Sequence, residues 1–256
     1  MDIYQHFRKE EHPFIDQVLS WKESLDRNYQ RRISDFLTPR EQTIFQSIVG
    51  NNEDYTWGLF GGIESERKRA ILAPYYEEIN QSDYGITLLE ATYPTKFITL
   101  EHRDVLGAFL SMGIKRKKLG DLIVQEGVIQ IIVAEEVATY VKTNLIEVKK
   151  AKVSLAETSI DNLLPNNETW ESRATTVASL RLDVVIKDIY NISRQNAVDF
   201  IQKGLVKVNF RKVENPAFQL EEADLISLRG KGRSRLKEIH GLSKKEKWKI
   251  TTEKLK

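Results

Sequence analysis

Residues 181–232 contain nine basic side chains and seven acidic ones, and the basic ones occur at spacings that would put them on one face of a small folded module. Arg181 precedes one apolar repeat of helical period, and Ser193, Arg194 and Gln195 begin a second. A guanidinium group holds a phosphate through two parallel hydrogen bonds, and the free N–H groups at a helix start favour an anion. The pattern therefore predicts a surface that binds a phosphate backbone, with Arg181 and Arg194 as its anchors.

Charge is divided unevenly along the chain. Residues 181–256 hold 18 Lys and Arg against 10 Asp and Glu, a net charge of +8, whereas residues 1–180 hold 21 against 27, a net charge of −6. The overall charge of +2 therefore conceals a polarised molecule. Such an asymmetry indicates a polyanionic partner, here RNA. A solvated lysine-rich tail explains residues 244–256 well, but the cations of residues 181–233 lie inside an apolar repeat.

Two short helices and a small sheet must position these cations. Leu182, Val185 and Ile186 fall on one helical face, and Ser193 is the expected N-cap of a second helix that ends at Gly204. Residues 206–209 alternate as a strand, a polar turn follows at residues 210–212, and residues 215–220 and 225–230 complete the module.

A second basic block comprises Lys115, Arg116, Lys117 and Lys118, between a predicted helix and a predicted strand. Four consecutive cations on a loop can follow a phosphate backbone, although most charge runs are simply solvated. We place the block among the RNA-contact candidates because a basic module lies downstream of it.

Helical and strand periods alternate in the upstream part of the chain. Residues 12–25 have helical spacing, and Thr38, Pro39 and Glu41 form a capping-box start for another helix, with a polar connection over residues 26–36. Residues 55–76 indicate a strand, a turn and a strand. Residues 86–158 follow the order βαββαβ, with a single last strand over residues 148–158, which is typical of the ferredoxin-like arrangement. Its central strands lack the aromatic residues with which RNA-recognition motifs stack bases, so the fold alone does not assign RNA binding.

The expected fold class is α+β, in five segments. We predict N-terminal helices with a short β-hairpin in residues 1–80, a ferredoxin-like RNA-binding domain in residues 81–161 and a linker in residues 162–180. The RNA-binding module then occupies residues 181–241, and a basic tail occupies residues 242–256.

The module resembles the αL motif, the RNA-binding domain named after small-subunit ribosomal protein S4. The resemblance rests on RLD at 181–183, SRQNA at 193–197, KGLVKVN at 203–209, Asp224 and RGKGR at 229–233. It implies a concave basic face that fits folded RNA, and Asp183 is expected to orient Arg181. Phe210 departs from the pattern, because a glycine often occupies that turn. The contact candidates that the resemblance implies are Arg181, Ser193, Arg194, Gln195, Lys203, Lys207, Asn209, Arg211, Lys212, Lys231 and Arg233.

The whole chain resembles the YlmH family of bacterial proteins, and the central stretch HRDVLGAFLSMGIKRKKLGDLIV adds to this resemblance. The family resemblance implies an RNA-binding protein in ribosome-associated quality control. Such a protein would bind rRNA and tRNA on large ribosomal subunits that carry a stalled nascent chain. We expect the protein to be cytoplasmic, because its amino-terminal residues lack the apolar core of a signal peptide, and we expect it to be a monomer.

The residue types argue against catalysis and cofactors. The chain has no Cys, its four His show no metal-ligand spacing, and no glycine-rich loop joins a strand to a helix, so we expect no metal, no small-molecule cofactor and no enzymatic activity. No apolar run approaches the length of a membrane span. Two alternatives remain open: an RNA-modifying enzyme of the pseudouridine synthase or methyltransferase type, with its site in residues 55–160, and a scaffold for cell division.

Overall fold

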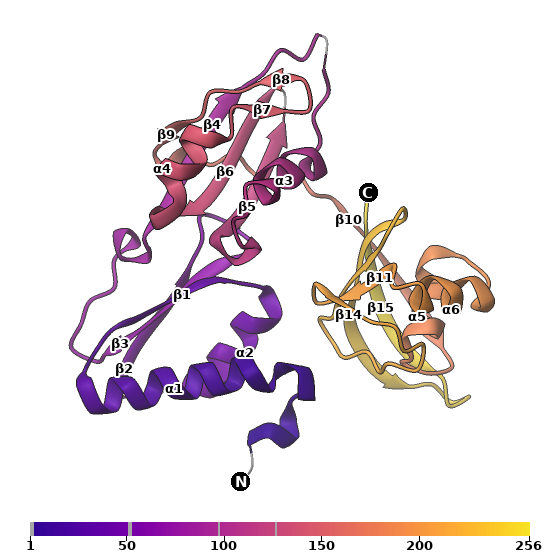
Figure 1. Cartoon of the computed structure of the whole chain (residues 1–256). Helices are drawn as coiled ribbons and strands as arrows, with labels where there is room; N and C mark the ends of the chain where they lie inside the picture. The colour runs from indigo at the N-terminus through magenta and orange to yellow at the C-terminus, as the bar shows by residue number, and fades with distance from the viewer. Residues whose placement is uncertain (1–2, 51–52, 97, 126) are drawn as a thin grey trace. The chain divides into compact units, whose positions relative to one another are not determined.

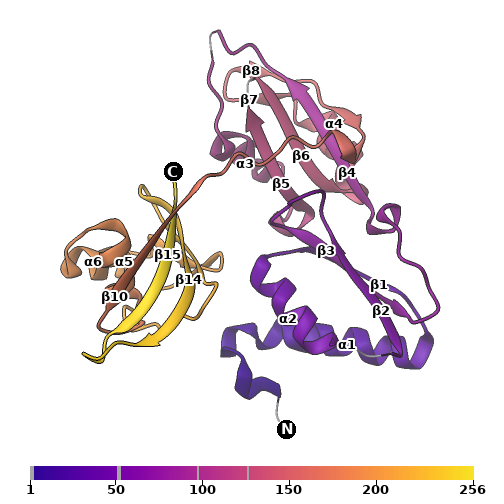
Figure 2. The same cartoon turned by 180° about the vertical axis from the view of Figure 1, so that it is seen from behind.

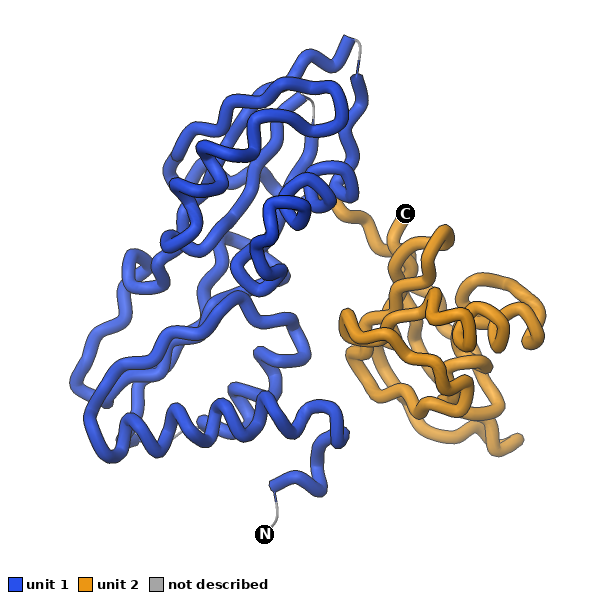
Figure 3. The backbone as a smooth tube through the Cα atoms, viewed as in Figure 1, with its two compact units in different colours: residues 1–166 blue, residues 167–256 orange. Residues whose placement is uncertain are grey.

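The computed structural model describes the 256-residue chain except residues 1–2, 51–52, 97 and 126. The chain forms two compact units, residues 1–166 and residues 167–256, which Figure 3 colours separately. Each unit has its own hydrophobic core. The described helices include none that is both long enough and apolar enough to cross a bilayer.

The first unit begins with two α-helices on a three-stranded antiparallel sheet (Figures 1 and 2). The expected capping box is confirmed: the Glu41 N–H donates to the Thr38 hydroxyl, and the Thr38 N–H donates to the Glu41 carboxylate at 2.8 Å. The elements are 3-10 turns η1 (Ile3–His6) and η2 (Lys9–Glu11), helices α1 (His12–Asn28) and α2 (Pro39–Val49), and strands β1 (Arg32–Leu37), β2 (Tyr55–Phe60) and β3 (Lys68–Pro74), in the sheet order β1-β3-β2.

The polar connection predicted between these helices is wrong, because it contains β1. This strand pairs antiparallel with β3 and buries Phe36 and Leu37. Its polar residues are satisfied by long-range contacts: the Ser34 hydroxyl accepts the Ala70 N–H at 2.7 Å, and Arg69 donates to the Ser34 carbonyl at 2.7 Å. Buried polar residues that are hydrogen-bonded weaken the alternation of apolar and polar residues in the sequence, so such a strand is hard to predict.

The second half of the first unit has the predicted βαββαβ order. Its sheet order is β5-β6-β4-β9 with all neighbours antiparallel, as a ferredoxin-like sheet requires. The elements are η3 (Gln81–Tyr84), β4 (Ile86–Thr92), α3 (His102–Ser111), η4 (Arg116–Lys118), β5 (Leu119–Gln125), β6 (Val128–Ala134), α4 (Glu135–Asn144), β7 (Glu147–Val148), β8 (Ala151–Lys152), β9 (Ala156–Thr158) and η5 (Ile160–Asn162). The single last strand expected over residues 148–158 is instead the small β7–β8 hairpin followed by β9.

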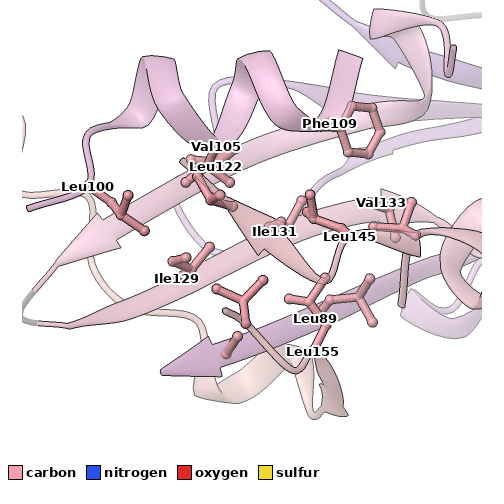
Figure 4. Close-up of a cluster of buried hydrophobic side chains, with 14 of the residues drawn as sticks. Leu89, Leu100, Val105, Phe109, Leu122, Ile129, Ile131, Val133, Leu145 and Leu155 are labelled. Atoms are coloured by element: carbon pink, nitrogen blue, oxygen red, sulfur yellow. The ribbon is translucent and has the colours of Figure 1, made fainter. Parts of the chain in front are cut away.

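The core of this half lies between the sheet and its helices. Val105 and Phe109 of helix α3 pack against the sheet, in the same cluster as Ile131 (Figure 4). These three residues are fully buried. The two halves of the first unit also share contacts. The Phe36 ring packs at Gly120, where a Cβ would lie 2.7 Å from the ring, and Asp121 accepts the N–H groups of Glu66 and Arg67 at 2.6 and 3.0 Å. Residues 1–80 and 81–161 therefore form one body.

The second unit packs two helices against one face of a six-stranded antiparallel sheet (Figure 1). Its elements are β10 (Trp170–Val177), α5 (Leu182–Tyr190), α6 (Arg194–Gln202), β11 (Val206–Val208), β12 (Arg211–Lys212), β13 (Leu225–Leu228), β14 (Gly232–Leu242) and β15 (Trp248–Leu255), in the order β10-β15-β14-β13-β11-β12.

Neither the linker nor the basic tail has the expected form, because each supplies a strand of this sheet. Strand β10 lies in the expected linker and β15 in the expected tail, and the two pair over eight positions from Trp170↔Leu255 to Val177↔Trp248. In β15, Ile250 and Thr252 point into the core and are 1% and 3% exposed. Because residues 244–256 are also rich in lysine, their composition indicated a solvated tail and did not indicate a strand.

Candidate nucleic-acid interface

A buried carboxylate joins the starts of the two helices in the second unit. Asp183, in the first turn of α5, is 1% exposed and accepts two hydrogen bonds from Arg181, at 2.9 Å from Nε and 3.1 Å from Nη2. Arg194, at the start of α6, donates its Nε to the same carboxylate at 3.1 Å. We call these three residues the arginine clasp. The expectation that Asp183 orients Arg181 is confirmed, and its bond to Arg194 was not foreseen.

The arginines of the clasp remain accessible. The side chain of Arg181 is 35% exposed and that of Arg194 is 61% exposed. Of the five N–H donors on each guanidinium, Asp183 takes two from Arg181 and one from Arg194. Arg181 is therefore held through two N–H groups and Arg194 through its Nε alone, and the other N–H donors of both guanidinium groups do not bind Asp183.

Electrostatics keeps the clasp charged. Burial alone would raise the pKa of Asp183, but the hydrogen bonds from Arg181 and Arg194 outweigh this effect and hold the pKa below its ordinary value. The hydrogen bond to Asp183 in turn raises the pKa of Arg181. At neutral pH the three side chains thus carry a net charge of +1.

Other helix-start candidates are partly used within α6. The Ser193 hydroxyl accepts the Asn196 N–H at 3.1 Å and thereby caps the helix. The exposed Gln195 amide donates to Asp199 at 2.9 Å. Both side chains lie beside Arg194 in sequence, but the helix already engages their polar groups.

A second group of cations surrounds the β11–β12 hairpin. Lys207 and Lys212 are cross-strand partners, and Lys212 extends over Gly204, where a Cβ would lie 1.7 Å from its Cε. Lys203, Lys207, Arg211 and Lys212 are all exposed. Lys212 forms an ion pair with Glu214 at 2.5 Å, whereas Lys203 and Lys207 have no ion-pair partner in the described part of the chain.

The hairpin turn explains two features of the sequence. Asn209 and Phe210 both have positive φ, at 48° and 68°, as a two-residue turn of this kind requires. The Asn209 amide donates to buried Asp224 at 2.7 Å, and its oxygen accepts the Leu225 N–H at 3.0 Å. The structure therefore uses Asn209, a predicted RNA contact, to hold the turn. Phe210 takes the left-handed conformation for which glycine is favoured.

The last candidates lie at the β13–β14 turn and have different roles. Lys231 is exposed, while Arg233 is half-buried, pairs with Glu168 at 3.2 Å and lies 5.9 Å from the centre of the Trp170 ring. Arg233 thus helps to hold β10 on the sheet.

Arg229 was missed as a candidate, although it belongs to the RGKGR motif. Its side chain is exposed, and its backbone N–H donates to the Leu205 carbonyl, which places this turn beside the end of α6.

The basic block of the first unit has mainly internal contacts. Lys117 and Lys118 each pair with Asp35 at 2.5 Å, and Lys118 also pairs with Glu136 at 2.6 Å. Arg116 donates to the carbonyls of Leu119 and Gly120, and its burial lowers its pKa to about 10.

Lys117 and Lys118 therefore join the two halves of the first unit through Asp35, whereas Arg116 binds carbonyls of its own half. Lys115 is exposed and has no ion-pair partner among the described residues. The structure brings Arg181 and Arg194 together, and gathers the hairpin lysines, but it does not present residues 115–118 as one basic surface.

Comparison with known proteins identifies the two RNA-binding segments. Residues 80–162 match the family described as "Putative RNA-binding domain in YlmH", and residues 180–226 match the S4 domain. The chain is 41% identical to the ribosome-associated protein quality control protein P2 of Bacillus subtilis, over 100% of this chain and 99% of that protein. It is also similar to the solved structure of the cell division protein ylmH from Streptococcus pneumoniae, with 29% identity and a TM-score of 0.55 over 64% of this chain and 99% of that one. The full-length match and both domain matches show that the chain belongs to the YlmH family of RNA-binding proteins.

Proposed function

We propose that this protein docks on rRNA and tRNA of a large ribosomal subunit during quality control of stalled nascent chains, and that it performs no chemistry of its own. The printed name of its Bacillus subtilis relative supports a role on the ribosome. Both family domains support RNA as the ligand.

The arginine clasp carries this proposal. A guanidinium held through one edge by a buried carboxylate loses little side-chain freedom when it meets a phosphate. Arg194 also stands at the start of α6, where the helix dipole favours an anion. At the start of α5 the backbone N–H groups of Leu182 and Asp183 already donate to the Phe218 and Pro216 carbonyls, so the contribution of Arg181 comes from its guanidinium. The clasp is therefore arranged to grip a backbone of fixed shape.

Shape recognition of folded RNA fits the module better than base reading. Reading of single-stranded bases depends on aromatic side chains that stack on them. Tyr190, the last residue of α5, is buried in the core, and Phe200 and Phe218 pack against the same core. A ligand with phosphates at fixed positions, such as rRNA or the arm of a tRNA, suits these residues.

The experiment compares two double variants of the full chain in co-sedimentation with large ribosomal subunits. We expect Arg181→Ala with Arg194→Ala to abolish co-sedimentation at moderate salt. The matched control, Lys244→Ala with Lys245→Ala, removes the same charge from an exposed turn of the same unit and is expected to retain binding. Equal loss in both variants, or retention in both, would contradict the role of the clasp.

Salt dependence adds a second readout. The slope of log K against log salt is negative, and each phosphate contact that is lost reduces its magnitude by about 0.9 for duplex contacts. If Arg181 and Arg194 each make one phosphate contact, the variant that lacks both should show a slope whose magnitude is smaller by about 2. An unchanged slope would mean that neither arginine touches phosphate.

A further inference from the structure

A cavity of about 250 Å³ lies in the first unit. The end of α1, the start of β2 and the end of β3 form its walls. We call it the tyrosine cavity, and its lining residues are Leu25, Asp26, Tyr29, Asp54, Tyr55, Pro74, Tyr75 and Tyr76. The known RNA-binding segments do not include any of them.

Three of its tyrosines are exposed to an unusual degree. Tyr29, Tyr75 and Tyr76 are 66%, 69% and 61% exposed, although they come from two distant segments. Tyr75 and Tyr76 meet edge to face, with ring centres 5.4 Å apart. Rings gathered in this way at a cavity differ from the single exposed apolar residues that any protein surface shows.

Tyr29 has a backbone conformation in which tyrosine is uncommon. It ends α1 in the left-handed conformation, with φ of 53°, where glycine or asparagine is normally found. A tyrosine there costs conformational energy and, at 66% exposure, buries little of its ring in return. A strained residue that contributes little to the core points to a role in binding.

The charge of the cavity is negative. Asp26 and Asp54 line it, and none of the described lining residues is Lys or Arg. The Tyr55 hydroxyl donates to the Asp26 carboxylate at 2.5 Å. One ring of the cavity already lies near a cation, since the Lys22 amine is 5.5 Å from the centre of the Tyr55 ring.

We propose that the tyrosine cavity binds an Arg or Lys side chain from a basic segment of another protein. Tyrosine faces attract a cation, and nearby carboxylates strengthen this attraction. The volume falls below the roughly 300–1,000 Å³ typical of small-molecule pockets, which suits one long side chain. RNA is a poor occupant, because Asp26 and Asp54 repel phosphate.

Fluorescence anisotropy of a labelled oligo-arginine peptide with the full-length protein tests this site. A peptide of equal length with citrulline in place of arginine is the uncharged comparison. We expect Tyr75→Ala with Tyr76→Ala to weaken oligo-arginine binding about tenfold or more. Tyr140→Ala removes another exposed tyrosine, and Glu147→Gln removes an exposed carboxylate elsewhere in the unit, so both should bind as the wild type does.

Tyr29→Gly separates binding from folding. Glycine relieves the left-handed strain, so the variant should be at least as stable to urea as the wild type, yet bind oligo-arginine more weakly. Wild-type affinity in both this variant and the Tyr75/Tyr76 double variant would overturn the proposal. So would an equal loss in Tyr140→Ala, equal binding of the citrulline peptide, or a loss of oligouridine RNA binding instead of peptide binding.

Discussion

Replacing Asp183 by asparagine tests whether Arg181 and Arg194 act through their geometry or only through their charge. The substitution removes one negative charge from a basic surface, so a purely electrostatic view predicts tighter RNA binding. The clasp predicts the reverse. The asparagine amide group can accept at only one oxygen, and its NH2 group faces a guanidinium, so at least one arginine loses its fixed position.

The structure sets the size of both effects. Asp183 is 1% exposed and accepts three charge-assisted hydrogen bonds. Loss of such a partner costs about 1–3 kcal/mol, so the second unit should unfold more easily by about this amount. One phosphate contact made by a fixed arginine is worth at least about 1.4 kcal/mol, and RNA affinity should therefore fall about tenfold.

The assay measures RNA binding and urea unfolding of the same full-length variants. Glu238→Gln is the matched control, since it also adds one unit of positive charge in the second unit but lies at an exposed position of β14. We expect the control to bind as tightly as the wild type or slightly more tightly. If Asp183→Asn bound RNA more tightly than this control while remaining folded, the reasoning about orientation would be refuted.

The pH dependence of stability follows from the lowered pKa of Asp183. A carboxyl with a lowered folded-state pKa contributes stability above its unfolded pKa of about 3.9 and loses it as the pH falls through the folded value. The difference in unfolding free energy between wild type and Asp183→Asn should therefore be full at pH 7 and shrink below about pH 4. A difference that stayed constant into strong acid would show that the ionised carboxylate is not its source.

Three further predictions concern contacts away from the clasp. Asp35→Asn should destabilise the first unit by about 1 kcal/mol, measured by urea unfolding, because the partly exposed Asp35 binds both Lys117 and Lys118, and this loss should disappear at high salt. Gly204→Ala should cost about 1–2 kcal/mol in the second unit, since φ is 64° and the new Cβ would displace Lys212; a neutral result in thermal unfolding would contradict that geometry. The hydrogen bond to Asp26 raises the pKa of Tyr55 to about 12, and Asp26→Asn should lower it toward 10, as followed by alkaline titration of the tyrosine NMR signals.

Local patterns were sufficient for the elements that local contacts determine. The Thr38 capping box, the βαββαβ order and the two helices after Arg181 all depend on residues within a few turns of one another. Asp183 lies two residues from Arg181, so their contact could be predicted from spacing. The bond from Asp183 to Arg194 joins two helices and could not.

Elements held by distant partners were missed for a physical reason. Strands β10 and β15 are each rich in polar residues, and their pairing joins segments about 80 positions apart along the chain. The ion pairs of the basic block could not be foreseen for the same reason, because the acid that binds Lys117 and Lys118 is Asp35, which lies about 80 positions earlier in strand β1. A charge run in sequence shows only the cations, whereas the fold decides which of them are already paired.

A crosslinking map of the protein on large ribosomal subunits carrying peptidyl-tRNA tests the central claim most directly. The account predicts rRNA and tRNA crosslinks to peptides that contain Arg181, Arg194 and residues 203–212, and their loss in the Arg181→Ala, Arg194→Ala variant. Crosslinks confined to the first unit, or crosslinks at residues 181–212 that persist in this variant, would contradict it.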